Sequence, residues 1–481
     1  MELRSVAVLG GGPGGLYFAR LMKLRRPECA VTLYEQSPPS ATFGFGVGLA
    51  TATQRRLAEA DPASLREVVA RAWSHEMSMS VDDVTVALPA DDLIAIGRAE
   101  LLEVLRAQAI AAGVDIRYGG RVAVDDLDAD VVVAADGVNS ATRERFATEF
   151  GARVEQHDGL YLWCGTDFAL PRAVFRAETG EHGTFVAHAY PYRRDRSTFL
   201  VETDPETWRR AGFDATTAAT PPERSDDASL GYLSTLFADT LRGSGLVGNR
   251  TRWLRFRTVT CARWHHGTTV LLGDAASTAH YSIGSGTKLA MESGIALVEA
   301  LDTGTDVESA LAAFESARRP AVEHLQDIAR RSMLWWDDFP RRLDMPVEQL
   351  LIAYMTRAGK VSLGQFARQA PAVVAAGLGQ YAGAPVERVP EDAVSWVLDR
   401  PLTTAGRSWP TRVGPRGELL QRDRVAVLDA GRTRQTALAA FDAGERLRRT
   451  GRSVGVRVPR GLRDLAADAL AGGRVDLVEW V

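Results

Sequence analysis

The chain has 481 residues, of which 46% are hydrophobic and 25% are charged, and its formal net charge is −4. These values are typical of an ordinary globular protein with two or three domains and a sizeable core. The mild acidity gives no reason to expect a nucleic acid or a membrane surface as partner.

The N-terminal residues lead directly into a predicted strand, with no basic segment and apolar run before it, so we expect no secretory signal. No uninterrupted stretch of about 20 apolar residues indicates a membrane-spanning helix. Cys29, Cys164 and Cys261 are far apart and odd in number, so we expect them to be reduced, in a cytoplasmic protein. The Cys and His residues show no metal-ligand spacing, and no metal is expected.

The first 35 residues predict a dinucleotide-binding unit: a strand, a glycine turn, a helix and a second strand. The turn contains Gly10, Gly12, Pro13, Gly14 and Gly15. Gly10, Gly12 and Gly15 occupy the three glycine positions of the motif G-x-G-x-x-G. The first allows a tight turn, the second lets the backbone approach a pyrophosphate, and the third lets the helix pack closely on the strand. The helix N-terminus offers free N–H groups to phosphates. Glu35, about 20 residues after the last glycine, is placed to accept hydrogen bonds from a ribose diol.

Three features follow in the chain. Glycines alternate over residues 43–48, which predicts either a loop close to a flat ligand or a glycine-rich turn. The pattern then predicts a helix over residues 51–73 and a strand over residues 77–88. Arg98 stands at the head of an amphipathic helix, where a surface charge is the plain interpretation.

Two further strands end in ligand-type motifs. The segment 129–135 contains a continuous apolar run from residue 131, which predicts a buried parallel strand, and it ends in Asp136-Gly137. A second strand ends in Gly273-Asp274, before a glycine loop and a long helix. Open α/β sheets place ligand groups at the carboxyl ends of such strands. We expect Asp274 to bind sugar hydroxyls, and the loop glycines to present N–H groups to a phosphate or a ring oxygen.

The sequence changes in character near residue 151. Residues 161–166, 183–192 and 197–203 are predicted strands separated by turns, which indicates an inserted, mainly antiparallel sheet. Near the end, two β-α-like pieces begin at residues 425 and 454. The predicted fold is α/β: a Rossmann-like domain with an inserted antiparallel β-sheet domain, a helical C-terminal part and a small α/β appendage. The corresponding boundaries are 1–160 with 250–320, 161–249, 321–388 and 389–481.

In this order, the three motifs resemble those of the single-component, FAD-dependent aromatic hydroxylases of the para-hydroxybenzoate hydroxylase type, over about residues 1–380. The resemblance implies that Gly10, Gly12, Gly15 and Glu35 bind the ADP half of FAD. It further implies FAD contacts for Pro13, Gly14, Arg98, Asp136, Gly137, Gly273 and Asp274. In this family NAD(P)H is bound transiently, which agrees with the single G-x-G-x-x-G motif of the chain.

A narrower resemblance concerns residues 182–191, 197–202 and 280–292. These are similar to the aryl-CoA hydroxylase branch, which includes salicylyl-CoA 5-hydroxylase and the monooxygenase half of 2-aminobenzoyl-CoA monooxygenase/reductase. The branch shares Ser282, where the wider family usually has proline. The chain departs from the branch at Tyr281, which replaces a Phe, and at Ser293, which replaces an acid, and both changes bear on the substrate.

The resemblance implies a monooxygenase that uses FAD, NADH or NADPH and O2 to hydroxylate an electron-rich aromatic ring through a C4a-hydroperoxyflavin. The predicted catalytic residues are Gly284, Ser285, Gly286, Thr287, His280 and Tyr281. His188 and Tyr190 are candidates for substrate contact, although such residues in strands more often pack in the core.

Several alternatives stay open at this point. The substrate is a CoA thioester, an aryl group on a carrier protein, or a free aromatic such as an indole or an aromatic acid. A flavin reductase or dehydrogenase of the same fold would not insert oxygen. Residues 389–481 are predicted to be a packing or interaction segment, since a complete (β/α)8 barrel takes about 200 residues or more. A shrunken remnant of a reductase half is the alternative.

Overall fold

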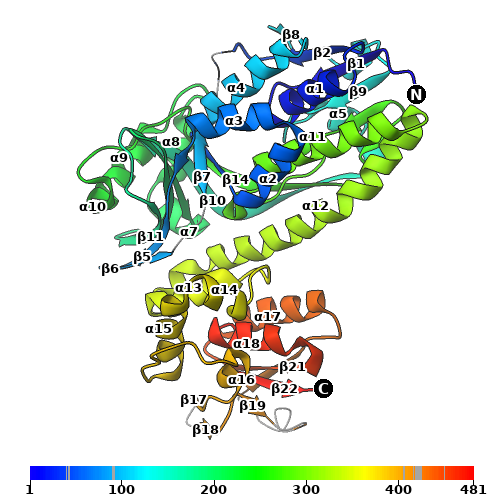
Figure 1. Cartoon of the computed structure of the whole chain (residues 1–481). Coiled ribbons are helices and arrows are strands. Elements are labelled where there is room, and N and C mark those ends of the chain that lie inside the picture. The colour runs from blue at the N-terminus through cyan, green and yellow to red at the C-terminus, as the bar shows by residue number, and fades with distance from the viewer. Residues whose placement is uncertain are drawn as a thin grey trace. The chain divides into compact units, whose positions relative to one another are not determined.

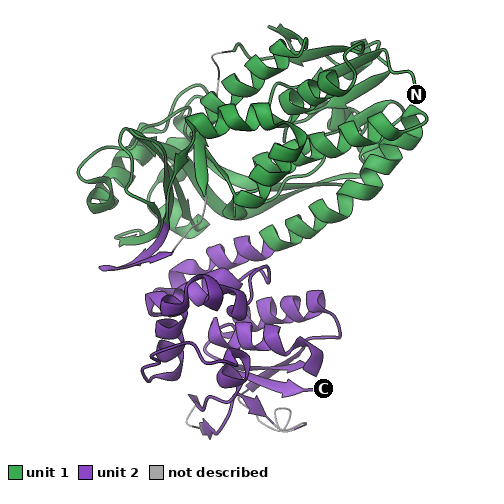
Figure 2. Cartoon of the chain, viewed as in Figure 1, with its two compact units in different colours: residues 1–76, 90–329 green, residues 77–89, 330–481 purple. Residues whose placement is uncertain are grey.

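The computed structural model of the protein describes residues 1–39, 41, 44–88, 93–404, 407–414, 417, 425–448 and 450–481. It divides into two compact units (Figure 2). The first contains residues 1–76 and 90–329, and the second contains residues 77–89 and 330–481. Within the described part of the chain, every helix is too short or too polar to cross a membrane.

A six-stranded sheet forms the base of the first unit, with the strand order β15-β16-β9-β1-β2-β8. All neighbours are parallel except the pair β15 and β16. The strands are β1 (Ser5–Leu9), β2 (Ala30–Glu35), β8 (Asp115–Tyr118), β9 (Val131–Ala134), β15 (His265–His266) and β16 (Thr269–Leu271). Because the carboxyl ends of parallel strands lie at one edge, the predicted motifs after β1, β2, β9 and β16 share that edge.

Helices α1 (Pro13–Arg25), α4 (Arg98–Ala111) and α11 (Gly286–Thr303) lie beside this sheet (Figure 1). The helix predicted over residues 51–73 is two helices, α2 (Thr51–Ala60) and α3 (Pro62–Arg71). The break lies at Asp61, whose carboxylate caps α3 by accepting the Ser64 N–H, before a proline at the first helical position. The remaining elements here are α5 (Ala141–Arg145), α6 (Ala147–Phe150) and a sheet of β3 (Gly46–Leu49), β7 (Ile94–Gly97) and β4 (Trp73–Ser74).

The predicted antiparallel sheet is present in the same unit, with the order β14-β10-β13-β12-β11. Its strands are β10 (Ala152–Thr166), β11 (Ala173–Gly180), β12 (Gly183–Arg193), β13 (Arg196–Thr203) and β14 (Trp253–Cys261), so it extends beyond residues 161–249 at both ends. One face carries Leu162, Phe185 and Phe199, which pack on the helices that follow β13 (Figure 1). These are α7 (Pro205–Arg210), α8 (Phe213–Ala219), α9 (Asp227–Leu236) and α10 (Ala238–Leu241). Side chains alternate along a strand, so the residues between them point to the opposite face.

The second unit combines helices with a small parallel sheet. The single strand predicted over residues 77–88 is a hairpin of β5 (Met77–Val81) and β6 (Val84–Leu88), because Asp82 adopts a positive φ of 50° and reverses the chain. The helices are α13 (Val347–Thr356), α14 (Leu363–Gln369), α15 (Pro371–Ala382) and α16 (Ala393–Leu398). Helix α12 (Val307–Asp337) has residues in both units.

The C-terminal residues form a βαβαβ arrangement. Its elements are β20 (Val425–Asp429), α17 (Arg434–Arg448), β21 (Ser453–Val458), α18 (Arg463–Ala471) and β22 (Leu477–Trp480). Together with β19 (Val413–Gly414) they give a parallel sheet of order β19-β22-β21-β20. The two predicted β-α pieces are confirmed, and β22 was not predicted. A hairpin of β17 (Leu402–Thr404) and β18 (Arg407–Trp409) precedes them.

The two-faced packing of the antiparallel sheet leads to a stability prediction. Phe199 is completely buried against the helices, so Phe199→Ala should lower the free energy of unfolding by about 3–5 kcal/mol. Leu254 in the neighbouring part of the sheet is 52% exposed, and Leu254→Ala should stay within about 0.5 kcal/mol of wild type. Thermal denaturation of both variants checks this, and equal midpoints would contradict the assignment of faces.

Candidate active site

The turn between β1 and α1 depends on glycine at two positions. Gly10 has a positive φ of 103°, and a Cβ on it would lie 2.4 Å from the Ala135 carbonyl oxygen. A Cβ on Gly15 would lie 2.1 Å from the carbonyl oxygen of Gly10. At Gly12, in contrast, a Cβ would meet no atom of the protein within 4 Å. The turn therefore packs tightly on β9 and leaves the Gly12 backbone open to a ligand.

Glu35 is held at the end of β2 beside this turn. Its Oε2 accepts the Gly11 N–H at 2.7 Å, and its Oε1 accepts the Ser37 N–H at 2.7 Å. A carboxylate has about four acceptor sites, so ribose hydroxyls can still bind. Helix α1 begins at Pro13 and has no acidic residue in its first turn, so its positive end is not neutralised locally.

The motif after β9 places a partly unsatisfied carboxylate at the same edge. The Thr142 N–H and hydroxyl donate to Oδ2 of Asp136 at 3.2 and 3.3 Å. Oδ1 of Asp136 is buried and has no hydrogen-bond partner in the described part of the chain. Gly137 has a φ of 79°, which turns the chain away from the strand end. Asp136 can therefore accept a hydrogen bond from a bound molecule.

Arg143 connects two of these loops and was not identified from sequence. Its side chain is buried and donates to the carbonyl oxygens of Val138 at 2.6 Å and Ala275 at 3.0 Å. Burial lowers the pKa of its guanidinium, although neighbouring acidic groups, including Asp136, oppose this effect. An arginine at the start of a short helix gives no sequence signal that it is buried.

Arg98 and Asp274 form an electrostatic pair after β7 and β16. Desolvation raises the pKa of Asp274, and the positive charges of Arg98 and Arg143 reduce this shift. The residue is nonetheless accessible to solvent. Desolvation also lowers the pKa of Arg98, which is half-buried and hydrogen-bonds through its side chain to no described residue. Arg98 is therefore not a plain surface charge.

The glycine loop before α11 is open along its backbone. Gly284 has a φ of 60°, and a Cβ on Gly284 or Gly286 would meet nothing within 4 Å. The Ser285 hydroxyl is buried without a hydrogen-bond partner among the described residues. Helix α11 begins at Gly286, includes Thr287 in its first turn and carries no acidic residue there. Its positive end can therefore receive a negatively polarised atom.

Three of the predicted substrate-side residues lie together, and Glu202 joins them. The ring centroids of Tyr281 and His280 are 4.0 Å apart, and that of Tyr161 lies 4.7 Å from Tyr281. Nε2 of His188 lies 3.3 Å from Oε2 of Glu202. Sequence reasoning assigned no role to Glu202, although an acid that ends the apolar run 199–201 was a usable signal.

The protonation states of this cluster follow from its surroundings. Burial lowers the pKa of His280 to about 4, so the ring is neutral at neutral pH. Its Nδ1 accepts the Ser282 N–H at 3.3 Å, which leaves the proton on Nε2. Burial alone would raise the pKa of Glu202, but His188, whose Nε2 lies 3.3 Å from the carboxylate, holds it below its usual value, and His280 and Tyr281 add to this effect. The cluster therefore contains a buried anion.

Tyr190 lies on the same face of the sheet, but its hydroxyl is already bonded. It donates to the Gly46 carbonyl at 2.7 Å, and burial raises its pKa to about 12. A Cβ on Gly46 would lie 2.7 Å from the Tyr192 ring. Gly46 thus allows β3 to approach the antiparallel sheet, while Phe43 of the preceding loop lies outside the described residues. A substrate contact for Tyr190 stays a prediction.

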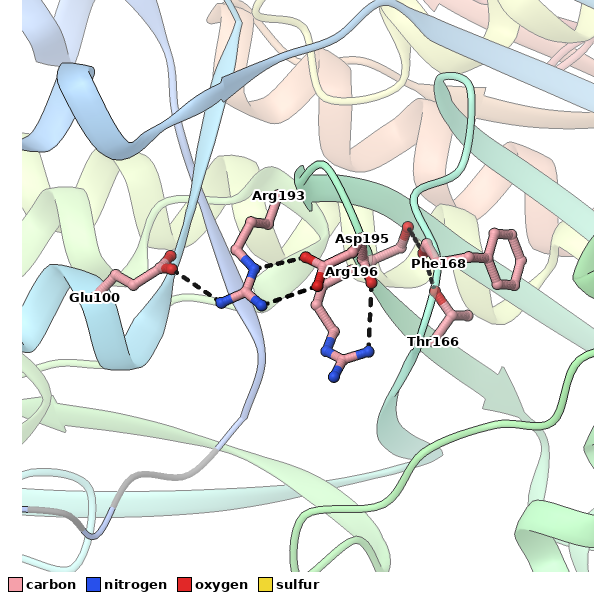
Figure 3. Close-up of polar contacts among 7 residues, drawn as sticks. Glu100, Thr166, Phe168, Arg193, Asp195 and Arg196 are labelled. Atoms are coloured by element: carbon pink, nitrogen blue, oxygen red, sulfur yellow. Dashed lines mark hydrogen bonds and ion pairs between the residues drawn. The ribbon is translucent and has the colours of Figure 1, made fainter.

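The end of the β12–β13 hairpin is joined to α4 by an ion-pair chain (Figure 3). Arg193 donates to Asp195 at 2.6 Å and to Glu100, in the first turn of α4, at 3.4 Å. These side chains are partly exposed, so each pair contributes about 1 kcal/mol or less. Their effect is positional, because α4 is the helix that begins with Arg98.

Three relatives of the chain are similar to it in sequence over most of its length. The chain is 41% identical to a salicyloyl-CoA 5-hydroxylase of Streptomyces sp over 73% of this chain and 69% of that protein. It is 39% identical to a 3-hydroxy-4-methyl-anthranilyl-[aryl-carrier protein] 5-monooxygenase of Streptosporangium sibiricum, over 77% of this chain and 98% of the relative. A protodeoxyviolaceinate monooxygenase of Chromobacterium violaceum is 31% identical, over 73% and 94% respectively.

Solved structures share the fold. The tetrameric form of 2-methyl-3-hydroxypyridine-5-carboxylic acid oxygenase has a TM-score of 0.56 at 19% identity, covering 77% of this chain and 98% of its own. PqsL of P. aeruginosa in complex with 2-aminobenzoylacetate has a TM-score of 0.55 at 20% sequence identity, and the match covers 71% of this chain and 98% of PqsL. The family described as "FAD binding domain" matches residues 4–329. The chain therefore belongs to this family of FAD-dependent aromatic monooxygenases.

Proposed function

We propose that this monooxygenase hydroxylates an aromatic acid whose carboxyl group is carried as a thioester, on CoA or on a carrier protein. The supporting observation is that the two relatives at 41% and 39% identity are named for an aryl-CoA and for an aryl-[carrier protein]. In both names the aromatic acid is attached to a thiol carrier. The reaction needs FAD, O2 and NADH or NADPH as reductant.

We propose that FAD lies along the shared edge of the parallel sheet. Gly10, Gly12, Gly15 and Glu35, with Pro13 and Gly14, hold its ADP half, because the open Gly12 backbone and the end of α1 suit a pyrophosphate. Asp136 and Gly137 supply the acceptor after β9, and Gly273 and Asp274 face the sugar-like chain. Arg98 balances the negative charge of Asp274. We place the flavin ring beside the backbone of Gly284–Thr287. The N–H groups of this loop and the positive end of α11 would polarise the flavin ring there.

When bound and reduced, FAD would supply the chemistry of O2 activation and oxygen transfer to the ring. The protein orients the substrate and limits water around it. Tyr161, Phe256 and Tyr281 form an aromatic cluster, with the Phe256 centroid 5.9 Å from that of Tyr281. His280 adds a neutral N–H donor, and Glu202 adds an acceptor. We place the reaction in the cytoplasm, which suits the three free and buried cysteines.

A free aromatic substrate is the second candidate. The relative at 31% identity, a protodeoxyviolaceinate monooxygenase, is covered over 94% of its length and its name contains no carrier. A flavin reductase or dehydrogenase of the same fold would consume NAD(P)H without placing labelled oxygen in a product. Both alternatives are separated from the thioester proposal by the following measurement.

We expect aryl thioesters to accelerate the anaerobic reduction of the FAD-loaded enzyme by NADH or NADPH more than the matching free acids or indoles do. Stopped-flow absorbance measures this acceleration for each class of compound. Turnover under ¹⁸O₂ should then place one labelled oxygen atom in the aromatic product. Acceleration by free acids or indoles alone would refute the thioester proposal, and absence of label would refute oxygen insertion.

Substitution of glycines tests the FAD position. Gly12→Ala should leave the apoprotein as stable as wild type, because no protein atom lies within 4 Å, but should weaken FAD binding by obstructing the phosphates. Gly15→Ala should lower both the stability of the apoprotein and its affinity for FAD, because the new Cβ would meet the Gly10 carbonyl oxygen at 2.1 Å. Titration with FAD, monitored by flavin fluorescence, and thermal denaturation of the apoprotein measure the two effects. Gly231→Ala, in α9 and equally free of neighbours, is the control, and wild-type FAD affinity in Gly12→Ala would contradict the assignment.

A further inference from the structure

Glu202 is a buried acid that belongs to neither the proposed cofactor site nor the apolar core of its sheet. Glu202 is the direct cross-strand partner of Tyr161 on β10 and of Val186 on β12. Directly paired residues lie on one face of a sheet, so Glu202 shares its face with Tyr161 and, two residues further along β12, with His188. The other face is filled by the apolar core against α7–α10. Glu202 therefore points away from that core.

This face meets the segment that leads to the glycine loop. The Tyr161 ring packs on Tyr281 at a centroid distance of 4.7 Å, and Tyr281 precedes Gly284 by three residues. Tyr281 and His280 are both among the groups that lower the pKa of Glu202, so its carboxylate lies close to their side chains. Glu202 thus lies between the sheet and the loop where we place the flavin ring, which is where an aromatic substrate has to lie.

One oxygen of this carboxylate is not used by the protein. Oε2 lies 3.3 Å from Nε2 of His188, whereas Oε1 is buried and has no hydrogen-bond partner among the described residues. The side chain is only 12% exposed. A buried acceptor without a donor is costly, and a ligand that supplies the donor relieves that cost.

We propose that Oε1 of Glu202 accepts a hydrogen bond from a ring hydroxyl or amino group of the substrate, and that its negative charge excludes aromatic acids with a free carboxylate. This assignment rests on the proposed function and specifies its substrate class. Accepting a hydrogen bond from such a group increases its electron donation into the ring, which favours attack by an electrophilic oxygen. A free carboxylate beside a buried anion is repelled, whereas a thioester is uncharged.

Two substrate features can therefore be tested on the FAD-loaded enzyme with four probes. These are the N-acetylcysteamine thioesters of 2-hydroxybenzoate and benzoate, and the two free acids. Dissociation constants come from the change in flavin absorbance. Wild type should bind the hydroxylated thioester about tenfold more tightly than either the benzoyl thioester or the free hydroxy acid, the ratio expected for one buried charge-assisted hydrogen bond or one repelled charge.

Glu202→Gln removes the charge with little change in shape. In this variant both tenfold ratios should shrink to about two or less, because the free acid is no longer repelled and the neutral amide accepts more weakly. The rate of oxygen transfer to the hydroxylated thioester should fall as well, while the affinity for FAD stays unchanged. A residue that only stabilised the fold would not change a ratio between two ligands.

Glu178→Gln is the matched control. Glu178 lies in the same sheet, on β11, and is paired with Arg176 at 2.7 Å. Its variant should keep both ratios of wild type. If Glu202→Gln does not retain FAD, Glu202→Asp replaces it: the charge remains and the oxygens withdraw by one methylene, so discrimination against the free acid should persist and the hydroxyl preference should be lost.

The outcomes separate this assignment from the proposed function. Wild type that binds the free acids as tightly as the thioesters, or that binds none of the four probes, contradicts the thioester proposal itself. A wild-type preference for the hydroxylated thioester that is unchanged in Glu202→Gln overturns only the role of Glu202.

Discussion

The close approach of β1 to β9 is the constraint on which the cofactor site depends. Their parallel register pairs Leu9 with Ala134, so the next residue, Gly10, packs directly on the Ala135 carbonyl. That contact and the Gly15–Gly10 contact leave room for no side chain, and they direct α1 with its N-terminus at the strand ends. Because β16 pairs with β9 in the same direction, Asp274 is brought to this edge from a distant part of the sequence.

The antiparallel sheet meets a different requirement, since it must present two unlike faces. Its apolar positions pack on α7–α10, and the intervening positions carry Tyr161, His188 and Glu202. The position of this second face relative to the first sheet is secured by small contacts. These include the Tyr190 hydroxyl on the Gly46 carbonyl and the Arg193 bridge to Glu100 at the head of α4. No single one contributes much free energy, but together they restrain the sheet face that carries Glu202.

The turns of the proposed cofactor site could be predicted from sequence because their requirements are requirements on the backbone. A glycine at Gly10 or an acid after a buried strand, as at Asp274, follows from local chain geometry and marks the sequence directly. Glu202 and Arg143 could not be placed in this way. Strand alternation tells which residues share a face, but which face is buried depends on the helices that cover it. The single strand predicted over residues 77–88 was wrong because the alternation is interrupted. Apolar residues stand at 77, 79 and 81 and then at 84, 86 and 88, and the chain reverses between the two sets at Asp82, which has a positive φ.

The two halves of the site also differ in their electrostatics, and this difference sorts their ligands. Both α1 and α11 begin without an acidic residue in the first turn, so two positive helix ends face the region assigned to FAD, which carries the phosphates. On the sheet face the fixed charge is negative, because His188 and Tyr281 keep Glu202 ionised despite its burial. At the positions that we propose for FAD and for the substrate ring, an anionic cofactor is therefore favoured and an anionic substrate is disfavoured. A substrate whose carboxyl group is masked as a thioester satisfies both conditions, since its own negative charges can lie on the carrier, away from the ring.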